Sequence, residues 1–256
     1  MIGAVRMVQR NALVYRRTWR GSVFSSFLQP TLFLVAIGMG LGRMIDAGAA
    51  ALPGGASYVQ FLAPGLLAAA AMQAATFEST YPVLDKITWH RNYEAIGATP
   101  MRTADLVLGE LAWIAVRLVT IAAAFVLVMS AFGIPRSWRV LLAIPAAVLT
   151  GLAFAAPIMA YAATRKSSNS FNVLYRFGVT PLFLFSGVFF STTRLPGWLQ
   201  HAAWLTPLFH GVELVRGLTL GWPVSADWLI HLAYLIALTA AGTAAARTAF
   251  RRRLYA

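Results

Sequence analysis

The sequence has no cysteine and few charged side chains. The absence of cysteine excludes disulfide bonds and cysteine-based metal sites. Only 11% of the 256 residues are charged, against about 25% in an ordinary soluble domain, whereas 59% are hydrophobic. A chain with so little polar side-chain material cannot cover a water-facing globule, so the composition predicts an integral membrane protein.

The sequence also lacks a recognisable catalytic site. No G-x-x-x-x-G-K-[ST] phosphate loop is present, so the chain is not expected to hydrolyse ATP in the usual way. Neither paired carboxylates nor a Ser/His/Asp set falls in a plausible pocket. No two of the four histidines lie four residues apart, as a pair of metal ligands on one helix would, and we expect each histidine to be structural or interfacial. We therefore expect no catalytic residue, no metal ligand and no cofactor on this chain. The histidines are His90, His201, His210 and His231.

Six apolar runs are long enough to cross a membrane, since a spanning helix needs about 20 largely apolar residues. Together they use up most of the chain, so residues 1–256 are predicted to form one all-α transmembrane domain. A cleaved signal peptide is the competing interpretation of the first run, because Ala47-Gly48-Ala49 resembles a cleavage site. The 21 residues of the run exceed the roughly 7–15 of a signal core, which favours a retained span. The expected spans are Ser22–Gly42, Tyr58–Thr80, Leu106–Phe132, Val140–Thr164, Phe171–Phe190 and Trp228–Thr248.

The net charge of +13 comes from basic residues that lie mostly at the ends of the apolar runs. Such placement fixes the orientation of a membrane protein and is not typical of nucleic-acid binding. Fourteen lysines and arginines fall on one side, in residues 1–21, 86–102, 165–166 and 247–253. Five fall on the other side, and six spans return both termini to the same side. We therefore expect both termini in the cytoplasm and a multi-pass protein of the cell membrane. Residues 1–21 mix arginines with apolar and aromatic residues, which is typical of a helix lying on the membrane surface.

The segment that follows the second span, residues 86–98, combines aromatic and charged residues at the expected cytoplasmic surface. Ile87, Trp89, Tyr93 and Ile96 give it a loosely amphipathic pattern, and Gly97 and Pro100 end it. A short helix of this kind either docks on a partner protein or is anchored in the interface by its aromatic side chains. The residues alone leave both interpretations open.

Three ionisable residues fall within or beside the apolar runs, where a charge costs about 2.5–3.5 kcal/mol on insertion scales. Glu110 and Arg117 are seven residues apart and share a helix face. We hypothesise that Arg117 pairs with Glu78 or Glu110 across the contact between spans two and three, and fixes a cytoplasmic gate. The alternative is that the glutamates lie at interface depth while Arg117 snorkels.

Several short motifs follow one another in an order that resembles the ABC-2 family of transporter permeases. They are Phe61–Leu67, Phe77–Tyr81, Trp89–Pro100, Gly109-Glu110, Pro196–Leu199, Thr206–His210 and Glu213–Arg216. Within that family, the chain is most similar to the permeases of nodulation-type lipo-oligosaccharide exporters and daunorubicin-resistance-type exporters. The resemblance runs through nearly the whole chain.

The resemblance implies roles for three segments. Residues 1–21 would form an amphipathic helix ahead of the first span. Residues 86–98, here named the coupling segment, would dock on a separate ATP-binding cassette ATPase that carries ATP and Mg. Residues 195–220, here named the outer segment, would form short re-entrant helices on the outer side. The expected ATPase-coupling residues are Lys86, Trp89, His90, Arg91, Tyr93 and Glu94. The expected residues of the outer segment are Pro196, Trp198, Pro207, His210, Glu213 and Arg216.

The resemblance further implies an exporter of amphipathic cargo, such as a lipid-linked saccharide, a glycolipid or a hydrophobic drug, in contact with membrane lipid. Two copies, or one copy and a homologous permease, would pair, and Gly38-x-x-x-Gly42 is one candidate for close helix contact. Two other classes remain open from the residues alone. An ion-coupled secondary transporter would use Glu78, and a membrane-embedded lipid-modifying enzyme would use Glu213 with His210.

Overall fold

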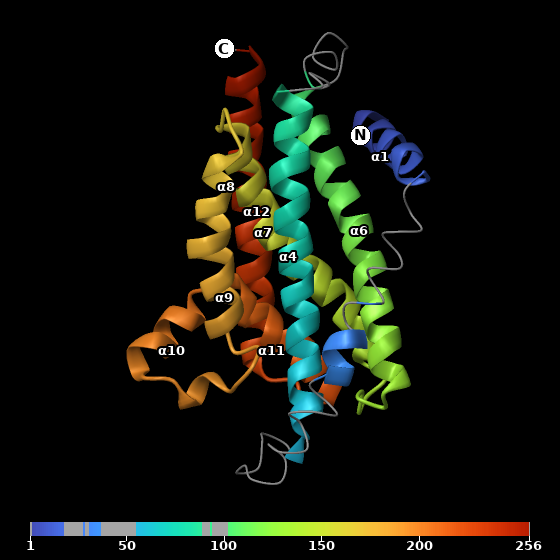
Figure 1. Ribbon diagram of the computed structural model, residues 1–256, viewed down its shortest axis with the longest axis vertical. Helices are drawn as coiled ribbons and strands as arrows, with labels where there is room; N and C mark the ends of the chain where they lie inside the picture. The colour runs from blue at the N-terminus through green and yellow to red at the C-terminus, as the bar shows by residue number, and fades with distance from the viewer. Residues whose placement is uncertain are drawn as a thin grey trace.

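The computed structural model describes residues 2–17, 28, 31–36, 55–88, 93 and 102–255. Within these ranges the regular structure is helical (Figure 1). The expected first span, Ser22–Gly42, falls largely outside the described residues, as do Gly38 and Gly42. The helices are α1 (Ile2–Tyr15), α4 (Tyr58–Thr88), α6 (Thr103–Ala131), α7 (Val140–Ala163), α8 (Asn169–Leu174), α9 (Thr180–Phe185), α10 (Gly197–Trp204), α11 (Pro207–Leu220) and α12 (Ala226–Tyr255).

Four of the described helices are long and apolar enough to cross a membrane: Tyr58–Thr88, Thr103–Ala131, Val140–Ala163 and Ala226–Leu254. They correspond to the expected spans two, three, four and six, and they define a multi-pass membrane protein. Two of them continue well past the predicted ends. Helix α4 runs eight residues beyond Thr80, and α12 runs seven beyond Thr248. Apolar residues stop where the hydrocarbon stops, but the backbone hydrogen bonds of a helix continue into the polar region.

The expected fifth span, Phe171–Phe190, is a shorter and interrupted helical stretch. Helices α8 and α9 are joined by a π-helical turn at Tyr175–Val179, so the stretch runs from Asn169 to Phe185. It ends at Ser186, after which Gly187 takes a left-handed backbone conformation with φ of 82°. The predicted end at Phe190 is therefore wrong by five residues.

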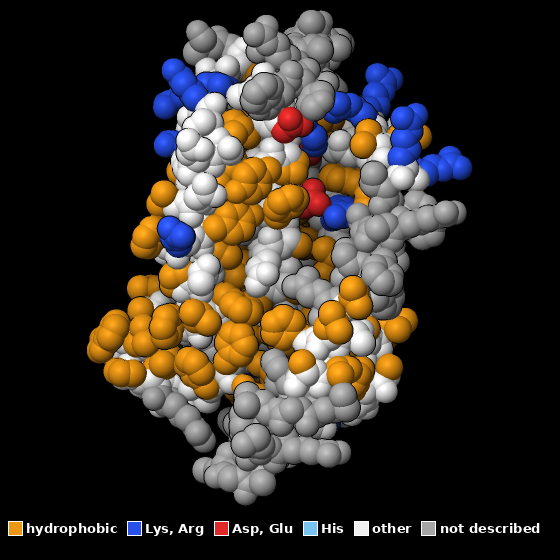
Figure 2. Space-filling model, in the orientation of Figure 1, with side chains coloured by type: hydrophobic (Ala, Val, Ile, Leu, Met, Phe, Trp, Pro, Cys, Tyr) orange, Lys and Arg blue, Asp and Glu red, His pale blue; other side chains and the backbone are white. Residues whose placement is uncertain are grey.

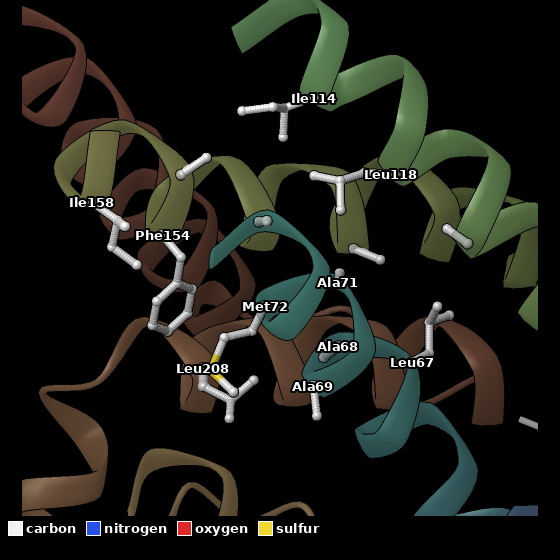
Figure 3. Packing of buried hydrophobic residues seen from close by; sticks show 14 of the residues in the cluster. Leu67, Ala68, Ala69, Ala71, Met72, Ile114, Leu118, Phe154, Ile158 and Leu208 are labelled. Carbon is white, nitrogen blue, oxygen red and sulfur yellow. The ribbon is translucent and has the colours of Figure 1, made fainter. Parts of the chain in front are cut away.

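The core lies where α4, α6, α7 and α11 meet, and small residues permit the close approach. A Cβ on Gly151 of α7 would lie 2.5 Å from a methyl carbon of Leu118 and 3.1 Å from the carbonyl oxygen of Ala71. Gly211 of α11 likewise faces Thr150 of α7. Figure 3 shows large side chains from these helices filling the space around the small ones. In a membrane the hydrophobic effect does not drive helices together, because lipid is as apolar as the side chains. Helices associate there largely through close packing of small residues.

The outer segment forms two helices at the end of the bundle opposite the C-terminus (Figure 1). Helix α11 begins at Pro207, with Thr206 as the N-cap residue whose hydroxyl accepts a hydrogen bond from the Phe209 amide at 3.3 Å. It ends at Gly221, whose φ of 72° suits a left-handed C-cap. Helix α11 is mostly buried against α4, α7 and α12, whereas α10 packs on fewer neighbours and exposes Trp198.

Candidate functional site

A buried carboxylate on α6, Glu110, joins side chains from three other segments. Lys86 of α4 approaches its two carboxylate oxygens at 2.7 and 2.8 Å. The Tyr93 hydroxyl donates a hydrogen bond to it at 2.9 Å, and the Asn11 amide of α1 donates another at 3.3 Å. We name these four residues the Glu110 cluster. Because Tyr93 belongs to the coupling segment, the cluster ties that segment to α1, α4 and α6.

The Glu110 cluster is shielded from solvent. The Glu110 side chain is 3% exposed, and Tyr93 is fully buried with its ring packed edge-on against Phe250 of α12 at 5.6 Å. Burial raises the pKa of the Tyr93 hydroxyl well above its usual value, and the nearby Glu110 charge and hydrogen bond raise it further. Tyr93 therefore stays protonated and acts as a donor to Glu110. A buried, charge-assisted network of this kind fixes its members in one geometry.

A second charge pair lies on the same two helices, further along the bundle. Arg117 of α6 binds Glu78 of α4 at 3.1 Å, and each side chain is 19% exposed. The Arg117 guanidinium also lies 4.6 Å from the ring centroid of Tyr15, the last residue of α1. Of the two partners considered for Arg117, the structure places it on Glu78, while Glu110 binds Lys86 instead. Figure 2 shows acidic side chains beside basic ones near this end of the bundle.

The other predicted coupling residues, Trp89, His90, Arg91 and Glu94, lie outside the described residues. Of the predicted coupling set, Lys86 and Tyr93 are described, and both enter the Glu110 cluster. The second span was predicted to end at Thr80, with Lys86 in a separate short helix, the coupling segment. The predicted separation is wrong, since Lys86 belongs to the last turn of α4, the helix of that span.

At the opposite end, Arg216 of α11 is almost completely buried, with 1% of its surface exposed. Its guanidinium donates to the carbonyl oxygens of Phe61 at 3.1 Å and Gly187 at 2.8 Å, and it binds Glu213 at 3.1 Å. It also lies 3.7 Å from the centroid of the Phe61 ring. Gly65 makes room for this arrangement, because a Cβ there would lie 3.2 Å from the guanidinium. Arg216 thus fixes the outer segment to α4 and to the turn after α9.

The structure also brings together two histidines that the sequence analysis treated separately. Nδ1 of His210 on α11 lies 2.7 Å from Nδ1 of His231 on α12, and the Tyr234 ring stacks on His210 at 4.1 Å. The residues are 21 positions apart on different helices, so no local spacing signals the pair. Glu213 binds Arg216 and His210 binds His231, so the pair considered for a lipid-modifying enzyme is divided between two separate contacts.

The remaining predicted residues of the outer segment occupy helix starts and the surface. Pro196 is the N-cap residue of α10, and Pro207 is the first residue of α11. Trp198 is 73% exposed, as expected for a side chain that faces lipid or the membrane interface.

The fold and the charge layout define a multi-pass helical membrane protein, and comparison with known proteins narrows the class. Residues 4–220 match the model of the family described as ABC-2 type transporter. The chain is 36% identical to Nodulation protein J of Rhizobium leguminosarum bv. trifolii over 216 residues, which cover 84% of this chain and 80% of that protein. It is 33% identical to Nodulation protein J of Bradyrhizobium diazoefficiens over 247 residues, covering 96% and 92%. It is 25% identical over 205 residues to the inner membrane transport permease YadH of Escherichia coli, covering 79% and 77%.

The chain belongs to the ABC-2 type transporter family. It is a transport subunit and not an enzyme. The family match confirms the resemblance noted from the motifs. Members of this family typically work with an ATPase subunit, which agrees with the absence of a phosphate loop from this sequence.

Proposed function

We propose that this chain is the membrane subunit of an ATP-binding cassette exporter that moves an amphipathic cargo out of the cytoplasm. A separate ATPase subunit binds ATP and Mg and docks on the coupling segment. The proposal is supported by the family membership and by relatives named Nodulation protein J and transport permease. The cargo class, a lipid-linked saccharide, glycolipid or hydrophobic drug, follows from the resemblance to lipo-oligosaccharide and drug exporters.

The Glu110 cluster is the observation that carries the proposal. Tyr93 comes from the coupling segment, and its buried hydroxyl donates a hydrogen bond to the Glu110 carboxylate. The same carboxylate binds Lys86 of α4 and accepts a hydrogen bond from Asn11 of α1. A force applied to the coupling segment by an ATPase therefore acts on three helices at once. The mechanism requires only that the ATP-bound and free states of the ATPase favour different arrangements of these helices.

The Glu78–Arg117 pair takes the role of a gate within this scheme. It joins α4 to α6 seven residues beyond Glu110, and Tyr15 extends it toward α1. Loss or exchange of this ion pair would allow α4 and α6 to separate next to the Glu110 cluster. The partly exposed pair costs less to break than the buried one, as a gate requires.

The proposed layout has six spans and one transmembrane domain of 1–256, with both termini in the cytoplasm. Basic side chains gather at the upper end in Figure 2, the end at which Figure 1 places both termini. This supports a cytoplasmic assignment for that end. The outer segment then lies on the opposite side as two re-entrant helices. Two such subunits, or one and a related permease, pair to form the transport path.

Retrieval of the ATPase tests the docking site directly. We expect the full-length permease to retrieve its ATPase from membranes, and the triple variant W89A/R91A/E94A to retrieve less by about thirtyfold or more, because truncating interface anchors commonly costs about 2 kcal/mol or more. The exposed Trp198→Ala variant in the outer segment serves as the control and should retrieve as much as the unchanged chain. A permease that purifies alone and moves cargo on an ion gradient without ATP would contradict the proposal.

A further inference from the structure

A groove of about 790 Å³ opens between the ends of α7 and α12. Phe250 of α12, which packs on Tyr93 of the Glu110 cluster, does not line it. The volume of the groove lies within the range of about 300–1,000 Å³ that holds small ligands. It lies at the end of the bundle that carries the C-terminus (Figure 1). Phe250 and Ala246 of α12 are fully buried in the core, and neither lines the groove.

The groove is apolar along its length because small side chains form its walls. Alanines from both helices contribute: Ala160, Ala163, Ala244, Ala245 and Ala249. The two helices approach closely just before the groove begins, since a Cβ on Gly242 would lie 2.6 Å from the Pro157 ring. Beyond that contact, Tyr161 supplies the one large ring among the described lining residues. An apolar trough at membrane depth is suited to a hydrocarbon chain.

The described residues at the mouth of the groove carry positive charge. Arg252 and Arg253 line it, together with the hydroxyl groups of Thr164 and Thr248. Arg165 lies beside it, with its guanidinium 4.6 Å from the Tyr161 ring centroid and its Nε donating to the Thr164 hydroxyl at 3.0 Å. Among the residues that the structure describes, no acidic side chain lines this groove, whereas Asp85 lines the groove between α4 and the turn that follows α7.

We infer that this groove binds an anionic phospholipid, with one acyl chain along the alanine walls and the phosphate on Arg252 and Arg253. Basic pockets between membrane helices at a membrane surface are suited to anionic headgroups. An adjoining apolar trough favours a lipid over free phosphate, because only a lipid has an acyl chain to fill it. A docked protein segment is the alternative occupant, and the ATPase-retrieval outcome below distinguishes it from a lipid. The inference is independent of the proposed ATPase partner and of the cargo.

Lipid titration monitored by native mass spectrometry tests the site on the purified full-length chain. The probes are phosphatidylglycerol, phosphatidylcholine with the same acyl chains, and inorganic phosphate. We expect phosphatidylglycerol to bind more tightly than phosphatidylcholine by about tenfold or more, because the two basic side chains at the mouth attract an anionic headgroup. Phosphate alone should neither bind nor compete.

Matched variants separate this groove from the general positive charge of the surface. R252Q/R253Q should weaken phosphatidylglycerol binding by about tenfold or more. R247Q/R251Q removes the same charge from the same helix at exposed residues that do not line the groove, so it should have a clearly smaller effect. Filling the trough with Ala245→Leu should weaken both lipids, and Ala241→Leu, on an exposed position outside the groove, should weaken neither.

Four results would overturn the inference. Equal losses in the two arginine double variants would mean a diffuse surface potential. Equal binding of the two lipids would remove the headgroup role. Competition by inorganic phosphate would indicate a free-phosphate site. Loss of ATPase retrieval in R252Q/R253Q with unchanged lipid binding would assign the arginines to a protein contact. An unchanged thermal midpoint in lipid-free detergent shows that each variant is folded.

Discussion

Glu110→Gln is expected to lower ATP-driven export by about tenfold or more while the permease still retrieves its ATPase. The substitution keeps an acceptor for Tyr93 and Asn11 but leaves the Lys86 ammonium without its counter-charge. Breaking a buried ion pair costs ~3–5 kcal/mol, which equals or exceeds a typical coupling free energy of ~1–3 kcal/mol between two sites. The substitution therefore removes the ion pair that joins Lys86 to α6, while the contact of Tyr93 with α6 is kept. Transport of a fluorescent lipid-linked oligosaccharide into inverted vesicles measures the effect.

The control for this prediction carries the same change of charge on the same helix. Asp105→Asn changes a half-buried side chain in the first turn of α6, outside the Glu110 cluster. It should leave export within about threefold, because an acidic side chain in the first turn of a helix typically contributes only ~0.3–1 kcal/mol. Glu110→Gln with unchanged export would show that the cluster does not couple the subunits. Loss of ATPase retrieval together with export would assign Glu110 to folding or docking alone.

Arg216→Gln is expected to lower the apparent thermal midpoint of the purified permease by about 6–12 °C. The side chain makes two hydrogen bonds to backbone carbonyl oxygens and one ion pair, and Gln cannot reach all three acceptors. Leaving buried partners unsatisfied costs on the order of 3 kcal/mol, and each kcal/mol shifts the midpoint of a domain of this size by ~2–4 °C. Because Arg216 fixes α11 to α4, the outer segment should loosen first.

Arg139→Gln is the matched control for Arg216. Arg139 also donates to a backbone carbonyl oxygen, that of Trp222 at 3.2 Å, but it is only partly buried and makes a single described hydrogen bond through its side chain. Its midpoint should change by less than about 4 °C, since one such bond contributes ~1 kcal/mol. Equal shifts in the two variants, or no shift in Arg216→Gln, would contradict the role of Arg216 as the anchor of the outer segment. Proteolysis of the outer segment in the two variants gives a second readout.

Hydropathy located the described membrane helices well, because an apolar run of about 20 residues matches the thickness of the hydrocarbon layer and is rare in soluble proteins. It was less successful for the ends of the helices. The apolar run of the second span ends at Thr80, but α4 continues to Thr88 and so brings Lys86 within reach of Glu110. Hydrophobicity reports where lipid contact ends, whereas helix ends depend on local backbone hydrogen bonds and on tertiary partners.

The charged residues of the site were recognised from the sequence, but their pairing was not. The spacing of Glu110 and Arg117 put both on one face of a helix and left two partners open for Arg117. Only the packing of α4 on α6 decides that Arg117 binds Glu78. The His210–His231 contact and the groove between α7 and α12 were missed altogether. Both arise between residues that are far apart in the sequence, so a one-dimensional pattern carries no signal for them.

Accessibility of the coupling segment tests the central claim, that an ATPase acts on this chain from the cytoplasmic side. The chain has no native cysteine, so a single introduced cysteine is labelled alone. Asn92→Cys should react with a membrane-impermeant maleimide in inverted vesicles and not in intact right-side-out vesicles, while Trp198→Cys in the outer segment should show the reverse. Labelling of Asn92→Cys from the outside would place the coupling segment on the wrong side of the membrane for an ATPase and would contradict the account.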